Sequence, residues 1–209
     1  RSDSHGDNCS MPIENERKFV LNERDTELEA KLTGMPGVDR HLLRQAYLDA
    51  PGLRIRSLEG EGETTHVFTY KRTVDGQVVE IETGLSAVDF GRLWTQRRET
   101  LVKVRYYWTE GRYHWDVDFF KRDDGSTYFA MAEVEMPEEQ TDPPPLPGFL
   151  AAHLLMIAPA LDPRFTSKRI ADQAHATSLL AEISANGGTV YDLRGRIGGS
   201  VTRGQGSGN

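Results

Sequence analysis

Cysteine is almost absent from this sequence, and its absence excludes two kinds of structure. Cys9 is the single cysteine in 209 residues, so the chain can form no internal disulfide and no cysteine-based zinc cluster. Long apolar runs are also lacking. The richest stretch, Phe149–Ile157, contains His153 and falls well short of the roughly 18 residues that a membrane span needs. We therefore expect a cytoplasmic protein with no membrane partner.

An excess of positive charge is missing as well. The chain carries 25 Lys and Arg against 32 Asp and Glu, a formal net charge of −7, which argues against nucleic acid as a partner. Hydrophobic residues make up 37% of the chain and charged residues 27%, a balance that supports a packed core and excludes general disorder. The histidines lack metal-ligand spacing such as His-x-x-x-His, so a histidine-based metal site is not expected.

Both ends differ in composition from the region between them. Residues 1–10 are polar, and we interpret them as a disordered leader or an expression remnant. Residues 187–209 contain eight glycines, which predicts a flexible tail. Organised sequence fills residues 11–186, and its length suits one domain.

Alternation of apolar and polar residues, the period-two pattern of strands, dominates this domain. It predicts strands over Met11–Leu21, Leu53–Leu58, His66–Thr73, Gln77–Thr83, Leu101–Trp108, Arg112–Phe120 and Tyr128–Met136. Helical patterns cover Thr26–Leu32, Arg40–Ala46, a segment behind a Ser86 cap, Leu146–Ala158 and Ser167–Ala185. The order of these elements predicts an α+β fold with a closed or strongly curved antiparallel sheet.

The strands carry charges of one sign in pairs, as in Arg54 and Arg56, with apolar residues on the opposite face. One interpretation is an amphipathic sheet with its charges in water. The repetition of same-sign pairs, opposite bulky aromatics, favours charges that point into a barrel wide enough for a ligand. Basic groups there suit a polyanion, and carboxylates beside that polyanion require a hard cation such as Mg²⁺ or Mn²⁺ between them. The pattern therefore points to metal and polyphosphate.

A set of motifs resembles one known family along residues 11–175. Glu14-Asn-Glu16-Arg-Lys18 is similar to the Glu-x-Glu-x-Lys signature of the CYTH domain, or triphosphate tunnel metalloenzymes. The likeness continues in order through Leu53-Arg54-Ile-Arg56, Tyr70-Lys71, Glu80-Ile-Glu82, Lys103-Val-Arg105, Trp115-Asp116-Val-Asp118, Ala132-Glu133-Val-Glu135 and Lys168. The resemblance implies a closed, eight-stranded antiparallel tunnel with helices packed outside.

The resemblance also implies roles for individual residues. The phosphate-binding positions match Lys18, Arg54, Arg56, Lys71, Arg105 and Lys168, and the metal-side carboxylates match Glu14, Glu16, Asp118, Glu133 and Glu135. Tyr47, in a segment similar to bacterial tripolyphosphatases, and Lys103 match a pair proposed to activate water. Glu80, Glu82 and Asp116 are expected to support the site, the first two either through salt bridges or at the metal.

The function implied is Mg²⁺- or Mn²⁺-dependent hydrolysis of a small triphosphate, first of all inorganic tripolyphosphate, to phosphate and diphosphate. Thiamine triphosphate and nucleoside triphosphates are alternative substrates, because all of them present the same triphosphate. Adenylate cyclase activity and a non-catalytic polyphosphate or nucleotide sensor remain further alternatives. The sequence leaves open whether the protein is a monomer or a homodimer.

Overall fold

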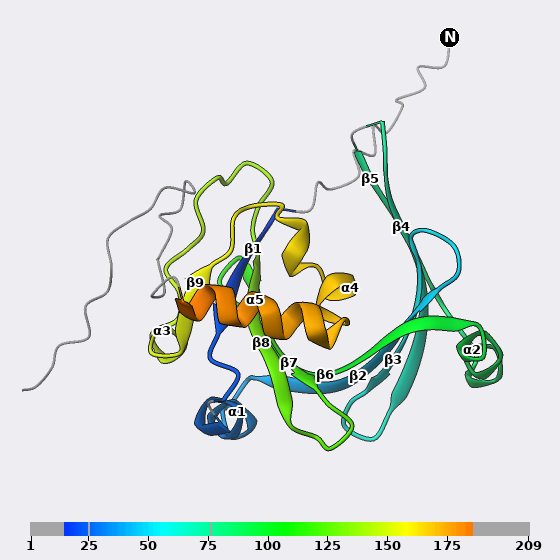
Figure 1. Ribbon diagram of the computed structural model, residues 1–209, viewed down its shortest axis with the longest axis horizontal. Helices are drawn as coiled ribbons and strands as arrows, with labels where there is room; N and C mark the ends of the chain where they lie inside the picture. The colour runs from blue at the N-terminus through cyan, green and yellow to red at the C-terminus, as the bar shows by residue number, and fades with distance from the viewer. Residues whose placement is uncertain (1–14, 25, 76, 186–209) are drawn as a thin grey trace, which may run out of the picture.

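One large antiparallel sheet forms the body of the molecule (Figure 1). The computed structural model describes residues 15–24, 26–75 and 77–185. The predicted leader, the predicted glycine-rich tail and Glu14 lie outside the described residues. The strands are β1 (Glu16–Leu21), β2 (Asp39–Leu48), β3 (Leu53–Glu59), β4 (Thr64–Val74), β5 (Gln77–Gly84), β6 (Arg97–Glu110), β7 (Tyr113–Lys121), β8 (Thr127–Glu135) and β9 (Leu154–Ile157). The helices are α1 (Thr26–Thr33), α2 (Ala87–Trp94), α3 (Gly148–Ala151), α4 (Ser167–Ile170) and α5 (Gln173–Ala185), with a 3₁₀ turn at Pro163–Phe165.

The prediction of an α+β fold is confirmed, but the prediction of a closed barrel of eight strands is wrong. The sheet has nine strands in the order β5-β4-β3-β2-β6-β7-β8-β1-β9. Closure would require the two edge strands, β5 and β9, to pair with each other, and each pairs only with its one neighbour. The sheet instead curves around α4 and α5 (Figure 1), and α5 packs against β8 and β9. The helix α5 thus packs on the face of the sheet at its β9 end.

The segment Arg40–Ala46, predicted as a helix, lies in strand β2 at the centre of the sheet. It pairs with β3 on one side and with β6 on the other. Backbone hydrogen bonds to two neighbouring strands outweigh the weak helical propensity of so short a segment. By contrast, the predicted helix at Thr26–Leu32 is confirmed as α1, and the Ser86 hydroxyl caps α2 by accepting from the Asp89 amide at 3.0 Å.

Two other predicted helices are shorter than expected. The pattern over Leu146–Ala158 divides into α3, which begins behind Pro147, and β9, whose backbone pairs with β1. The pattern over Ser167–Ala185 breaks between α4 and α5. The reason is Asp172, whose Oδ1 accepts from the amides of Ala174 and His175 at 3.0 and 3.1 Å and so begins a new helix.

Apolar residues pack on both faces of the curved sheet. On the convex face, Phe19 and Trp115 pack with Leu28 of α1 and Leu150 of α3. On the concave face, α4 and α5 cover one end, where an apolar cluster includes Val20, Phe129, Met131, Ile170 and Leu179. The rest of the concave face keeps its charged side chains uncovered. Among the described residues, no helix combines the length and the apolar character that crossing a membrane requires.

Candidate active site

A cavity of about 870 Å³ occupies the charged part of the concave face. The residues that the sequence singled out and that line it are Glu16, Lys18, Tyr47, Arg54, Arg56, Lys71, Glu80, Glu82, Lys103, Arg105, Asp116, Glu133, Glu135 and Lys168. Asp118 lies beneath the lining, fully buried. Strand alternation explains this gathering, because residues two apart point to the same face of a sheet.

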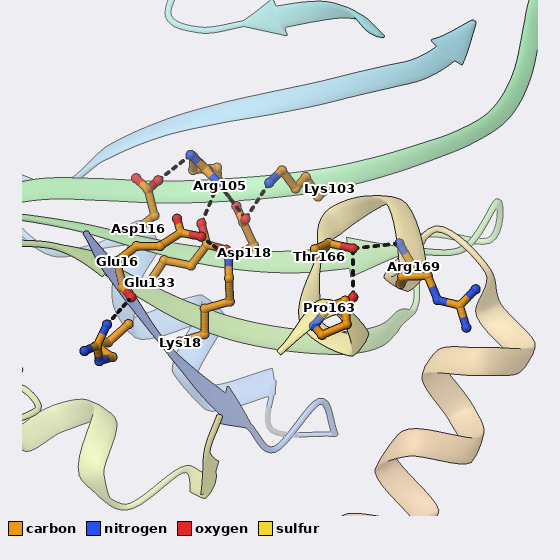
Figure 2. A network of polar contacts seen from close by, with 11 residues as sticks. Glu16, Lys18, Lys103, Arg105, Asp116, Asp118, Glu133, Pro163, Thr166 and Arg169 are labelled. Atoms are coloured by element: carbon orange, nitrogen blue, oxygen red, sulfur yellow. Dashed lines mark hydrogen bonds and ion pairs between the residues drawn. The ribbon is translucent and has the colours of Figure 1, made fainter. Parts of the chain in front are cut away.

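The buried cluster, as we call Lys18, Lys103, Arg105, Asp116, Asp118 and Glu133, comes from β1, β6, β7 and β8 (Figure 2). Asp118 is its centre. The Arg105 guanidinium donates to both carboxylate oxygens of Asp118 at 2.7 Å, and Lys103 Nζ donates to Oδ2 at 2.5 Å. Arg105 is the register partner of Asp118 across the β6–β7 pair and also forms an ion pair with Asp116. One carboxylate thus serves two buried cations.

The contacts of Asp118 with Arg105 and Lys103 shift the pKa values of Asp118 and Lys103. Burial alone would raise the pKa of Asp118, but Arg105 and Lys103 outweigh it and hold that pKa well below its usual range. Burial and the neighbouring Arg105 lower the pKa of Lys103, although Asp118 opposes them. Asp118 also compensates the charge of Arg105, so it compensates the charge of Lys103 only in part.

Lys18 forms the β1 side of the buried cluster. Its Nζ lies 2.5 Å from Glu133 Oε1 and 2.9 Å from Glu16 Oε1. The register explains the contact, since Lys18 lies directly opposite Glu133 in the β1–β8 pair. Burial by itself lowers the pKa of Lys18, and the two carboxylates more than offset this, so the pKa lies above its usual value. Lys18 remains an ammonium ion.

The open cluster, defined as Arg54, Arg56, Lys71, Glu80 and Glu82, lies on β3, β4 and β5. Arg54 donates to Glu80 at 2.9 Å, Arg56 donates to Glu82, and Lys71 Nζ lies 3.1 Å from Glu80. The exposed fractions of these side chains lie between 17% and 42%, whereas those of the buried cluster lie between 0% and 21%, so the two ranges overlap and only the open cluster reaches higher values. Ion pairs hold the cluster together, yet it still faces the cavity.

Two donors in the open cluster lack an acceptor. The Nε atoms of Arg54 and Arg56 are buried and have no hydrogen-bond partner in the described part of the chain. Burial, followed by the nearby charge of Arg54, lowers the pKa of Arg56, although Glu82 and Glu80 act in the opposite direction. Buried donors without partners cost free energy unless a ligand or water satisfies them. An anion in the cavity would supply acceptors and negative charge together.

Tyr47 lies between the open cluster and the C-terminal helices. It is opposite Arg54 in the β2–β3 register, and Lys168 Nζ of α4 lies 5.5 Å from the centre of its ring, within the range of a cation–π contact. No described contact joins Tyr47 to Lys103, the residue predicted to act with it. Lys103 instead binds Asp118, so each member of the predicted pair has its own partners around the same cavity.

Sequence reasoning missed two polar residues of this surface, Gln45 and Thr69. Gln45 lines the cavity and bonds Tyr47, whereas Thr69 donates to Glu82 at 2.7 Å. Gln45 was missed because Arg40–Ala46 was predicted as a helix. If that segment is taken as a strand, Gln45 shares a face with Tyr47, just as Thr69 shares one with Lys71, two positions further along β4.

Comparison with known proteins assigns the chain to a family. The family model of the CYTH domain matches residues 12–155, which include β1 to β8 and the beginning of β9. The chain belongs to the CYTH domain family. No curated protein matches the chain.

Solved structures resemble this CYTH chain only distantly. The inorganic triphosphatase NE1496 is 21% identical, with a TM-score of 0.44, and the match covers 77% of this chain and 95% of that one. A proposed adenylate cyclase from Vibrio parahaemolyticus is 13% identical, with a TM-score of 0.41 over 62% of this chain and 78% of that one. The family assignment therefore rests on the domain match.

The carboxylates of this CYTH domain have the chemistry that a hard divalent cation needs. Glu16, Asp116, Glu133 and Glu135 bring carboxylate oxygens to one cavity, and buried Asp116 Oδ1 has no hydrogen-bond partner in residues 15–24, 26–75 and 77–185, although His114 Nε2 lies 3.2 Å away. Within the described ranges, no group of three or more His, Cys, Asp or Glu side chains is already arranged to hold a metal ion. The oxygen donors fit such an ion in kind, while Lys18 and Arg105 occupy part of them.

Proposed function

We propose that this CYTH protein is a triphosphatase that hydrolyses inorganic tripolyphosphate to phosphate and diphosphate with Mg²⁺ or Mn²⁺. The observation that carries the proposal is one cavity with two unlike walls. One wall has guanidinium donors without acceptors, and the other has carboxylates around Arg105 and Lys18. A triphosphate with a bound cation complements both walls, because its oxygens accept from arginine while the cation satisfies the carboxylates.

In this proposal the open cluster binds the phosphate chain. Arg54 and Arg56 would direct their unpartnered Nε atoms to phosphate oxygens, with Lys71 and Lys168 adding positive charge from β4 and α4. Planar guanidinium groups suit phosphate oxygens because two parallel donors can engage them at once. The strands fix these side chains, so the substrate is held in one orientation.

Glu16 and Glu135, with Asp116 and Glu133 beside them, would hold the cation. When bound, the ion would neutralise charge on the phosphate oxygens. Glu16 and Glu135 are register partners across the β1–β8 pair, which places their backbones side by side at the same end of the cavity. Lys18 would then bind Glu133 alone and would keep its ammonium group directed at the phosphates.

Lys103 is the side chain that we propose as acceptor of the proton from attacking water. Burial and Arg105 lower its pKa, so its ammonium ion loses a proton more easily than that of an exposed lysine, and proton acceptance requires the resulting neutral amine. Lys103 is only 3% exposed, yet it lines the cavity. Asp118 would hold the resulting ammonium ion in place after proton transfer.

The test is phosphate release from tripolyphosphate, ATP and thiamine triphosphate, with Mg²⁺, with Mn²⁺ and in EDTA. We expect turnover of tripolyphosphate that disappears in EDTA and returns with metal. Glu16→Gln should lower kcat by roughly 10²-fold, the usual loss when an electrostatic contact to the transition state is removed. Glu61→Gln, at an exposed position in the turn before β4, serves as the matched control and should leave turnover intact.

Other results of this assay would point elsewhere. Full turnover in EDTA would contradict the metal-dependent reaction. Tight binding of tripolyphosphate without release of phosphate under any metal would instead indicate a non-catalytic sensor. Conversion of ATP to cyclic AMP and diphosphate would indicate a cyclase, and preference for ATP or thiamine triphosphate would change the substrate while leaving the reaction class as proposed.

A further inference from the structure

Gln45 is a buried polar side chain inside the cavity, and its contact determines how Tyr47 can act. Gln45 is 2% exposed and lies two residues before Tyr47 on β2, so both side chains share the concave face. Gln45 Nε2 donates a hydrogen bond to the Tyr47 hydroxyl oxygen at 2.6 Å. This oxygen therefore receives a donor from within the protein.

The hydroxyl hydrogen of Tyr47 consequently has to be donated elsewhere. No acceptor for it is found among the residues that the structure describes. Of the charged groups that act on Tyr47, the carboxylate of Glu99 has the smallest effect, and the others are cations: Arg54 lies opposite in the register, Arg56 lowers the pKa of the hydroxyl, and Lys168 lies over the ring. Groups of this sign attract an anion, and an anion has the acceptor oxygens that the hydroxyl lacks.

The protonation state of Tyr47 agrees with a role as donor. Burial raises the pKa of Tyr47 to about 12, even though Arg54 and Gln45 act in the opposite direction. The phenol therefore keeps its proton throughout the neutral range. A group that holds its proton this firmly serves well as a hydrogen-bond donor and poorly as a base.

We infer that Gln45 is a positioning residue, which holds Tyr47 so that its hydroxyl donates a hydrogen bond to an oxygen of the bound triphosphate. The inference rests on the proposed function. It gives Tyr47 a binding role toward phosphate, separate from the proton transfer at Lys103, and it explains why a glutamine amide is buried at the edge of a cationic wall. The competing explanation is that Gln45 only satisfies the packing of β2 and acts independently of Tyr47.

A double-mutant cycle separates the two explanations. Gln45→Met keeps the length of the side chain and removes the donor, and Tyr47→Phe removes the hydroxyl. The Kd of tripolyphosphate is measured by calorimetry in EDTA, where turnover is absent, and KM and kcat are measured with Mg²⁺. Ser57→Ala, a change at a buried polar residue of β3, is the control for packing, and Gln45→Asn replaces Gln45→Met if the latter does not fold.

We expect Tyr47→Phe to weaken binding by about tenfold and Gln45→Met by about fivefold, as the loss of a charge-assisted and of a neutral hydrogen bond would do. In the Tyr47→Phe background, Gln45→Met should cause no further loss, because its effect passes through the hydroxyl. KM should rise in both variants, with a smaller change in kcat.

Two outcomes would overturn the inference, and they differ from each other. If the wild type binds tripolyphosphate but Gln45→Met weakens binding equally with Tyr47 and with Phe at that position, Gln45 acts through packing, and the proposed function stands. If the wild type neither binds tripolyphosphate in EDTA nor shows a measurable KM with Mg²⁺, the proposed function fails, and the inference fails with it.

Discussion

The buried cluster and the open cluster are built from the same kinds of residue and differ in how completely they are satisfied. In the buried cluster Asp118 is fully buried, Lys103 is 3% exposed, and Arg105 donates to both oxygens of Asp118 through Nε and Nη2. In the open cluster, Arg54 forms ion pairs with Glu80 and Glu82, Arg56 donates to Glu82, and each arginine leaves a buried Nε without an acceptor in the described part of the chain. The buried cluster leaves one acceptor, Asp116 Oδ1, without a hydrogen-bond partner in the described residues, whereas the open cluster leaves two donors.

The buried cluster mainly fixes side-chain positions, whereas the open cluster has donors left for a ligand. Buried charges are costly to desolvate, and they are tolerated only when partners of opposite charge surround them. Such a network fixes side-chain positions, and a ligand that enters it has to replace contacts that are already made. Donors without partners have the opposite property, because they become fully satisfied only when an acceptor enters. We expect changes in the buried cluster to affect folding first and changes in the open cluster to affect ligand affinity first.

The largest effect is expected from Asp118→Asn. This change leaves Lys103 and Arg105 buried without their shared counter-charge, and breaking a buried pair in this way costs roughly 3–5 kcal/mol of unfolding free energy. Urea denaturation measures it. Glu80→Gln, which breaks pairs of the open cluster, should cost about 1 kcal/mol or less, and exposed Asp49→Asn should cost nothing measurable. Equal losses for Asp118→Asn and Glu80→Gln would remove the distinction between the clusters.

An intermediate effect is expected from Arg54→Ala and Arg56→Ala. Each change removes charge-assisted donors to phosphate, so the affinity for tripolyphosphate should fall by about 1.5–3 kcal/mol, or roughly tenfold to 150-fold. Calorimetric titration gives the affinity, and urea denaturation of the same variants should show little change in the free energy of unfolding. Arg98→Ala, at an arginine bound to Asp49 on the surface, is the matched control. Unchanged affinity in both variants would mean that these arginines do not bind the substrate.

The smallest effect is expected at His114, on the rim of the buried cluster. Its contact with Asp116 raises the pKa of the imidazole against the opposing effect of burial. A raised pKa means that the folded state binds the proton more tightly, so the added stability is complete below the unfolded value of about 6.5 and disappears as the pH rises through the folded pKa. His114 is partly exposed, and solvent screening keeps the effect small.

Unfolding midpoints of the wild type and of His114→Gln, measured from pH 5 to pH 9, test this prediction. We expect the wild type to be the more stable protein at the acidic end, with the two curves converging toward the alkaline end. A difference between the two unfolding midpoints that stays constant at all pH values would mean that His114 contributes through packing alone. Its charge would then not interact with the buried cluster.

The sequence determined which charges share a face. Strand alternation placed Arg54 with Arg56 and Lys103 with Arg105, and the cavity lining follows that pattern. Most strands and the first helix were predictable for the same reason, because a period of two or of 3.6 residues is written locally in the chain. The roles of the individual site residues remain predictions for the experiments above.

Only the tertiary structure decided where the strands end up and which charges meet. The strand β2 pairs with the next strand, β3, and with distant β6, and the short β9 pairs with distant β1. The local patterns of Asp39–Leu48 and Leu154–Ile157 do not contain these distant partners. The sheet stays open because its two edge strands, β5 and β9, do not pair with each other in the described residues. Pairing register likewise set Arg105 beside Asp118 and Lys18 beside Glu133. Alternation fixes the face of a side chain, but its partner across the sheet depends on how distant strands align.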